Sequence, residues 1–279
     1  MIDLHTHSTA SDGTFSPGDL VNKAVSKKLK VLAITDHDTV AGLEEAKKAA
    51  QNQDIIFIPG IELNIQWPTG EFHLLGLGLK QVSDDLNSII TYLQRQRETR
   101  NQKIVELLNK DGFEMTMTEL IDRFETESIG RPHIAQMMVE KGYVKQRQQA
   151  FDNFLGKGRQ YYVDRAGADL SMASKAIKNS GGVPVHAHPL SLYLSINTLE
   201  TTMEEIKAKG VMGLEAYHPA IRVSQGQQLE KIARKLDMFV TAGSDYHGKV
   251  RADRHLGKTA GNEKINDRFY FEELAKYLQ

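Results

Sequence analysis

The sequence lacks cysteine, long apolar runs and a strong net charge, and each absence excludes a class of protein. With no cysteine among 279 residues, the chain has no disulfide framework, and any bound metal must be held by nitrogen and oxygen. No stretch of about 18 or more apolar residues predicts a membrane span, and no charged-then-apolar leader is present. The formal net charge of -1 argues against non-specific coating of a polyanion. We therefore expect a cytoplasmic protein with no membrane partner.

What is present is ordinary for a globular protein. The composition is 40% hydrophobic and 25% charged. A chain of this length can bury a full core, and it can form either one barrel or two domains.

Short apolar runs alternate with helical patterns along much of the chain. The runs typical of β-strands cover residues 1–4, 31–34, 55–58, 72–77, 182–185, 211–216 and 238–241. The helical patterns that follow several of them cover residues 17–28, 40–50, 172–179, 199–209 and 225–235. This alternation predicts parallel strands joined by helical crossovers, and seven strands suit a β/α barrel. An open sheet has the same pattern, but the polar residues at the strand ends favour the barrel.

The region from residue 80 to residue 164 interrupts this alternation. It has almost no strand pattern, and Leu86, Ile89, Ile90 and Leu93 form an apolar stripe at helical spacing. Further helices are expected at residues 117–124, 132–141 and 146–154. We interpret this region as an α-helical insertion between the fourth and fifth strands, with residues 1–79 and 165–279 forming the barrel. The alternative is a set of outer helices without a function.

Histidines and acidic residues gather at the ends of the predicted strands. His5 and His7 are two residues apart, so on an extended segment both rings point to the same side. The other members of the set are Asp12, His37, Glu62, His73, His188, Asp245 and His247. A lone histidine beside a strand is more often a hydrogen-bonded polar residue than a ligand. Burying so many of these groups is costly unless they are paired or bound to metal, and the pattern therefore predicts a site for several metal ions.

Five short segments closely resemble the motifs of the polymerase and histidinol phosphatase (PHP) family. They are residues 3–8 (DLHTHS), 35–37 (TDH), 60–62 (GIE), 187–189 (AHP) and 243–247 (GSDYH). The resemblance extends over nearly the whole chain. It implies a distorted, TIM-like seven-stranded β/α barrel that holds a trinuclear centre, usually of manganese, iron, zinc or magnesium ions. It therefore implies a hydrolase that acts on phosphoric esters.

The resemblance also implies how the ligands divide among the metals. One metal would take His5, His7, Glu62 and Asp245, a second Asp12, His37 and His247, and a third Glu62, His73 and His188. Dications within roughly 4 Å of one another lower the pKa of a bridging water and neutralise phosphoryl oxygens. The expected nucleophile is thus a metal-bridging hydroxide, and no serine or cysteine nucleophile is needed.

The predicted insertion carries a second group of candidate residues. Pro132 suits the first position of a helix, which leaves backbone N–H groups beside Arg131 and His133. A helix start flanked by a guanidinium and an imidazole can bind an anion. Lys157 and Arg159 lie in a glycine-containing loop that can approach a phosphate. A solvated basic face is the alternative, but the arrangement at the helix start favours a second contact with substrate phosphate.

Within the PHP family, this insertion resembles one branch in particular. The sequence of residues 130–135 (GRPHIA), followed by the loop 156–158 (GKG), is similar to that of nucleoside 3′,5′-bisphosphate phosphatases and 5′→3′ exoribonucleases. The resemblance implies a nucleotide or short RNA as substrate. A pocket that recognises two phosphates would discriminate against simple monophosphates, because an unfilled basic pocket loses the binding energy of its partner.

Three further residues near the predicted strand ends are candidates. His218 follows the sixth strand, where it can contact the phosphate or protonate the leaving oxygen. A structural role at the strand end remains equally open for it. Arg131 and His133 complete the catalytic candidates. Arg222, about one helical turn after His218, is a further candidate for phosphate contact, and the role of His255 is open.

Two other functions compete with the nucleotide phosphoesterase. One is a histidinol-phosphate or other small-molecule phosphatase of the same family, and the helical insertion argues against it. The other is a non-catalytic, metal-stabilised module that binds nucleic acid, similar to the family domains attached to bacterial replicative polymerases. No polymerase-sized region accompanies this chain. No stable protein partner is implied by any of the three.

Overall fold

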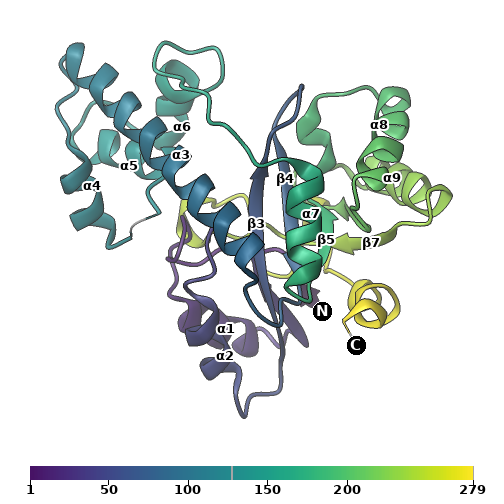
Figure 1. Ribbon diagram of the computed structural model, residues 1–279. Helices are drawn as coiled ribbons and strands as arrows, with labels where there is room; N and C mark the ends of the chain where they lie inside the picture. Colours follow the sequence, from purple (N-terminus) through teal and green to yellow (C-terminus); the bar gives the residue numbers. More distant parts are fainter. Residues whose placement is uncertain (127, 279) are drawn as a thin grey trace. The chain divides into compact units, whose positions relative to one another are not determined.

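In the described part of the chain, seven strands form one sheet, part of which Figure 1 labels, and their order in the sheet is their order in the chain. The computed structural model describes residues 1–126 and 128–278, so Glu127 and Gln279 lie outside the described part. The strands are β1 (Ile2–Asp3), β2 (Val31–Ile34), β3 (Ile56–Ile65), β4 (Phe72–Leu77), β5 (Val183–His186), β6 (Gly213–Tyr217) and β7 (Phe239–Ala242). The chain divides into two compact units, residues 1–90 with 167–279 and residues 91–166. We call them the barrel unit and the helical unit and describe each by itself.

The sheet of the barrel unit is nearly closed. Beyond the ends of β1 and β7, Thr6 and Tyr246 form a parallel bridge, in which the backbone N–H of His7 donates to the carbonyl oxygen of Tyr246 at 2.9 Å. The predicted α/β class and the distorted seven-stranded barrel are therefore confirmed.

The expectation that all strands are parallel is wrong for β4. This strand pairs antiparallel with both β3 and β5. Only residues 66–71 separate β3 from β4, whereas a parallel neighbour requires a crossover of about a dozen or more residues. The reversal has a consequence for function, because β4 begins at the edge where its neighbours end. His73, its second residue, thereby lies at the same edge as residues that follow the other strands.

Helices cover the outside of the barrel unit. They are α1 (Pro17–Ser26), α2 (Leu43–Ala50), α7 (Leu170–Asn179), α8 (Ile196–Ala208) and α9 (Val223–Lys235). The start of α1 shows why the sequence folds this way locally. Ser16 Oγ accepts a hydrogen bond from the backbone N–H of Asp19 at 3.1 Å, and Pro17 occupies the first helical position. On the inner face of α1, Leu20 and Val21 pack into a buried cluster with Leu32 of β2.

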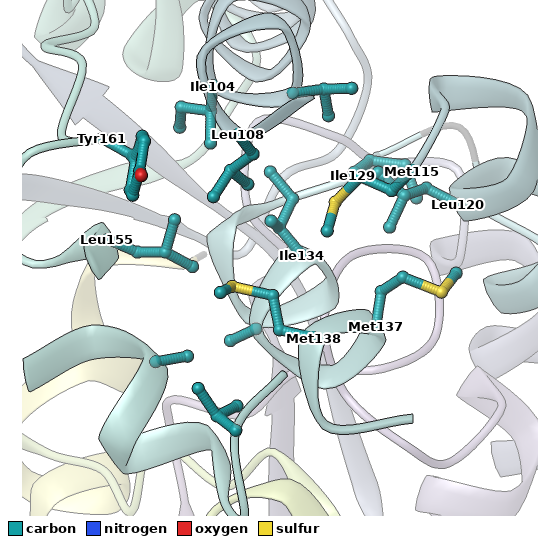
Figure 2. Close-up of a cluster of buried hydrophobic side chains, with 14 residues drawn as sticks. Ile104, Leu108, Met115, Leu120, Ile129, Ile134, Met137, Met138, Leu155 and Tyr161 are labelled. Carbon is teal, nitrogen blue, oxygen red and sulfur yellow. The ribbon is translucent and has the colours of Figure 1, made fainter. Parts of the chain in front are cut away.

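The helical unit has a hydrophobic core of its own. The long helix α3 (Asp84–Lys110) begins in the barrel unit and ends in the helical unit, which also contains α4 (Met117–Phe124), α5 (Arg131–Glu140), α6 (Arg147–Ala150) and the π-helical turn Phe151–Leu155. Figure 2 shows Ile104, Leu108, Ile134, Met138 and Leu155 side by side in this core. Burying such a side chain contributes about 1.5–3 kcal/mol, so the core stabilises the helical unit internally.

Within residues 1–126 and 128–278, no helix combines the length and the apolar character that crossing a lipid bilayer requires.

Candidate metal centre

The barrel brings His5, His7, Glu62 and Asp245 into one buried cluster. The Nε2 atom of His7 lies 3.2 Å from Glu62 Oε2 and 3.0 Å from Asp245 Oδ1. The Nε2 atom of His5 lies 3.4 Å and 3.5 Å from the same two oxygens. One atom of each of the four residues lies within 4.8 Å of the others. These four side chains could hold one metal ion.

A second group adjoins the first and shares His7 with it. Asp12 Oδ1 lies 3.3 Å from His247 Nε2 and 3.9 Å from His37 Nε2. The rings of His7 and His247 stack with their centroids 4.1 Å apart. Asp12, His37 and His247, the set that the family resemblance implies for one metal, thus lie together with His7.

Glu62 lies at the centre of a third group. Its Oε1 atom is 2.9 Å from His73 Nδ1 and 3.0 Å from His188 Nε2. Its Oε2 atom is 3.0 Å from His37 Nδ1. A carboxylate with imidazoles on both oxygens can contact more than one cation. All nine residues predicted as ligands therefore lie together in the barrel unit.

The contacts in this cluster suit metal coordination better than hydrogen bonding. Among the described residues, His5 Nε2, both ring nitrogens of His7, Asp12 Oδ1 and Glu62 Oε2 are buried without a hydrogen-bond partner. Buried polar atoms are nearly always hydrogen-bonded, and leaving them unsatisfied is costly. Nitrogen and oxygen lone pairs that converge in this way fit divalent cations, and the donor set contains no thiolate.

Charge coupling shifts the pKa values inside the cluster. Burial alone would lower the pKa of His7, but Asp245 and Glu62 outweigh it and raise that pKa to about 10. Burial would raise the pKa of Glu62, yet His37 and His5 hold it well below its usual range. In the metal-free protein His7 is therefore an imidazolium beside carboxylates, and a cation must displace its proton.

Glu215 orients one of the proposed ligands, although the sequence analysis did not single it out. This fully buried residue of β6 lies with Oε1 3.0 Å from His5 Nδ1, and its Oε2 accepts the backbone N–H of His188 at 2.8 Å. The Nε2 atom of His5 is thereby directed towards the cluster. The available signal was a single acidic residue inside the apolar run 211–216.

Two buried aspartates fix the loops that carry other members of the cluster. Asp36 accepts hydrogen bonds from the backbone N–H of Ser8 at 2.7 Å and from Ser11 Oγ at 2.6 Å. Asp3 accepts from the backbone N–H of Ser244 at 2.9 Å. Each carboxylate ties the end of one strand to the loop after a neighbouring strand. These loops are therefore held in place by hydrogen bonds to buried carboxylates.

His218 lies at the edge of the cluster beside a buried arginine. Its Nε2 atom is 3.3 Å from Asp245 Oδ2, and its Nδ1 accepts the backbone N–H of Ala220 at 3.1 Å. Arg254 contacts Asp245 Oδ2 through Nη1, which also lies 2.9 Å from His218 Nε2. Burial lowers the pKa of His218. No sequence pattern pointed to Arg254, because an isolated arginine in a loop has no distinctive spacing.

The candidates for phosphate contact lie mainly in the helical unit. The guanidinium of Arg131 donates to the carbonyl oxygen of Leu155 at 3.5 Å and lies 5.3 Å from the ring centroid of Tyr162. His133 is buried, and its Nδ1 accepts the backbone N–H of Gly130 at 2.9 Å, so one ring nitrogen caps the start of α5. Lys157 and Arg159 are exposed in the loop after the π-helical turn, whereas Arg222 is exposed at the start of α9 in the barrel unit.

Comparisons with known proteins agree with this arrangement. The PHP domain model matches residues 3–178. The chain is 33% identical to a 5′-3′ exoribonuclease of Haemophilus influenzae, over 88% of this chain and 89% of that protein. It is 29% identical to a 3′,5′-nucleoside bisphosphate phosphatase of Chromobacterium violaceum, over 92% of this chain and 91% of that protein. The crystal structure of a predicted metal-dependent phosphoesterase from Bifidobacterium adolescentis is 30% identical, with a TM-score of 0.87 over 99% of this chain and 96% of that one. The chain therefore belongs to the PHP domain family and is a metal-dependent phosphoesterase, a hydrolase.

Proposed function

We propose that this phosphoesterase hydrolyses nucleoside 3′,5′-bisphosphates and the 5′ ends of short RNA. The observation that carries the proposal is the buried convergence of His5, His7, Glu62 and Asp245, whose unsatisfied atoms suit cations. The relatives named as an exoribonuclease and a nucleoside bisphosphate phosphatase support a nucleotide as the substrate.

The barrel residues would hold two to three divalent cations. The proposed ligands are His5, His7, Asp12, His37, Glu62, His73, His188, Asp245 and His247. Bound dications lower the pKa of water towards neutrality and neutralise the oxygens of a phosphoryl group. Imidazole and carboxylate donors accept manganese, iron, zinc or magnesium. Glu215 would keep His5 aligned, and Asp36 and Asp3 would keep the loops of the centre in place.

We assign to His218 the stabilisation of the leaving group. Because Nδ1 accepts the backbone N–H of Ala220, the ring proton of a neutral His218 lies on Nε2. That nitrogen faces Asp245 at the edge of the cluster. As a neutral ring, His218 would donate a hydrogen bond from Nε2 to the ester oxygen that leaves; as an imidazolium it would donate a proton to that oxygen.

The helical unit would bind a second phosphate of the substrate. Arg131 lies at the first turn of α5, where backbone N–H groups and the helix dipole favour an anion. His133, Lys157 and Arg159 belong to the same unit. Arg222, in the barrel unit, is a separate candidate for a phosphate contact. A phosphate that accepts two parallel hydrogen bonds from one guanidinium is recognised by the geometry of these bonds as well as by charge. This contact would distinguish bisphosphates and RNA from simple monophosphates.

A comparison of products tests the proposed function. After reconstitution with manganese, the protein is given adenosine 3′,5′-bisphosphate, a 5′-phosphorylated RNA oligomer, histidinol phosphate and an aryl phosphate. The proposal predicts that kcat/KM is highest for the bisphosphate or the RNA. Preference for histidinol phosphate would instead indicate a small-molecule phosphatase. Binding of RNA without release of phosphate or nucleotide would indicate a non-catalytic module.

A further inference from the structure

A polar pocket of about 280 Å³ lies between the loops that follow β6 and β7. Pro219 forms part of its wall after β6. Asp253, His255 and the segment 258–262 form the wall after β7. The carboxyl ends of barrel strands are where barrel enzymes place their binding loops. None of the residues around this pocket has a role in the function described above.

The loops that line the pocket also carry residues at the edge of the candidate metal centre. Pro219 follows His218 in the chain, and Asp253 and His255 flank Arg254. The buried side chains of His218 and Arg254 contact each other, and both contact Asp245 Oδ2. The two loops that line the pocket therefore also carry the two buried side chains at the edge of the metal cluster. A substrate group that extends from the metal centre past His218 and Arg254 would reach the pocket.

The chemistry of the pocket suits an uncharged polar heterocycle. Its walls provide the ammonium of Lys258 and the imidazole of His255, which can donate to carbonyl oxygens and ring nitrogens. The acidic member, Asp253, is already engaged by the guanidinium of Arg251 at 3.1–3.2 Å. Pro219 adds an apolar surface on which a flat ring can lie.

Local hydrogen bonds hold this loop in shape. Lys258 Nζ donates to Asn262 Oδ1 at 2.7 Å, and the backbone N–H of Lys258 donates to the carbonyl oxygen of His255 at 3.0 Å. The backbone N–H of Thr259 donates to the carbonyl oxygen of Glu263 at 2.9 Å. The donors of the pocket are therefore placed before a ligand arrives, which lowers the entropy lost on binding.

We propose that this pocket binds the base of the leaving nucleotide, an inference that rests on the proposed function and specifies its substrate. In the reaction, the oxygen of water forms a new bond to phosphorus and the bond from phosphorus to the ribose oxygen breaks. The ribose oxygen takes up a proton, and water gives one up. The nucleotide that leaves is then held at its base by Lys258 and His255.

Removing the base from the substrate tests the proposal. The kcat/KM of the manganese-loaded protein is compared for adenosine 3′,5′-bisphosphate and ribose 3,5-bisphosphate, which lacks the base. We expect the wild type to prefer the adenosine compound by roughly 2- to 10-fold for each hydrogen bond formed. Lys258→Met and His255→Ala should each reduce this preference towards one. Lys249→Met, an exposed lysine outside the pocket in the same region of the chain, should keep the wild-type preference.

Three outcomes would overturn the assignment. Equal kcat/KM values of the wild type for the two bisphosphates would show that the base is not bound. An unchanged preference in both pocket variants would place the base elsewhere. Hydrolysis of the aryl phosphate but of neither bisphosphate would refute the proposed nucleotide substrate itself, and the pocket assignment with it. Because His255 is exposed and Lys258 is partly exposed, we expect both variants to fold, and thermal denaturation verifies this.

Discussion

The Nδ1 atom of His5 lies 3.0 Å from Oε1 of Glu215, and both residues are fully buried. His5 follows β1 and Glu215 lies in β6, so the two residues are far apart in the chain and meet only in the folded barrel. A carboxylate behind a ligating histidine fixes the ring orientation and raises its basicity. Here it presents the opposite ring nitrogen to Glu62 and Asp245.

Replacing Glu215 by glutamine should therefore weaken metal binding without unfolding the protein. The amide keeps the shape but loses the charge, and its NH₂ group would face the imidazole or the backbone N–H of His188. We expect manganese affinity to fall by about 10- to 100-fold, as measured by calorimetric titration. Glu205→Gln, an exposed residue of α8, serves as the control and should bind as the wild type does. Unchanged affinity in Glu215→Gln would contradict this role.

Metal binding should release protons and strengthen as the pH rises. The carboxylates around His7 raise its pKa to about 10 in the metal-free protein, so this residue carries a proton at neutral pH. A cation can coordinate the ring only after that proton leaves, and the apparent affinity therefore increases as the pH rises towards that value. Calorimetry in two buffers of different ionisation enthalpy counts the released protons. The same binding heat in both buffers would mean that none is released.

Glu230 should stabilise the barrel unit in a pH-dependent way. Hydrogen bonds from Arg268, at 2.8 and 3.0 Å, are the largest cause that lowers its pKa to about 2. A depressed carboxyl pKa contributes stability above the unfolded value of 4.5, and this stability is lost as the pH falls towards 2.

For Glu230→Gln we expect a loss of about 1 kcal/mol at pH 7, which corresponds to a decrease in Tm of ~2–4 °C. The difference in Tm from the wild type should narrow between pH 5 and pH 3. Thermal denaturation at several pH values measures this, and a difference that stays constant would argue against the ion pair.

Arg131→Ala should separate substrates by their number of phosphates. Removing one partner of a buried, charge-assisted contact costs ~2–5 kcal/mol. We expect a loss of this size in kcat/KM for bisphosphate or RNA, and little change for a minimal aryl phosphate. Arg123→Ala in the same unit removes an exposed pair with Glu140 and should affect neither substrate. Equal losses on both substrate types would exclude the proposed role of Arg131.

The sequence predicted most strands well because they are short apolar runs buried on both faces, whereas β3 (Ile56–Ile65) continues well beyond the predicted residues 55–58. It did not predict the direction of β4. The alternation of strands and helices suggested parallel pairing throughout, and the decisive fact was the short link of residues 66–71, which has no room for a crossover. The length of the link between β3 and β4 therefore determined the direction of β4, whereas the alternation of strands and helices did not.

The sequence also indicated which histidines and carboxylates would meet, because most of them follow strands that end at one edge, whereas Glu62 and His73 lie within β3 and β4. It gave no indication of Glu215 or Arg254. Each is a single charged residue whose neighbours in the fold lie on other strands and loops, so no spacing in the sequence connects it with His5 or Asp245. Such contacts emerge only when the barrel closes.

The content of divalent metal in active protein tests the central claim most directly. The protein is stripped with a chelator and reconstituted with manganese. Elemental analysis and aryl phosphate turnover are then measured, with Asp245→Ala alongside. The account predicts two to three ions per wild-type chain, turnover that is lost on stripping and returns with metal, and a loss of both in the variant. Full turnover by protein that contains no divalent metal would contradict it.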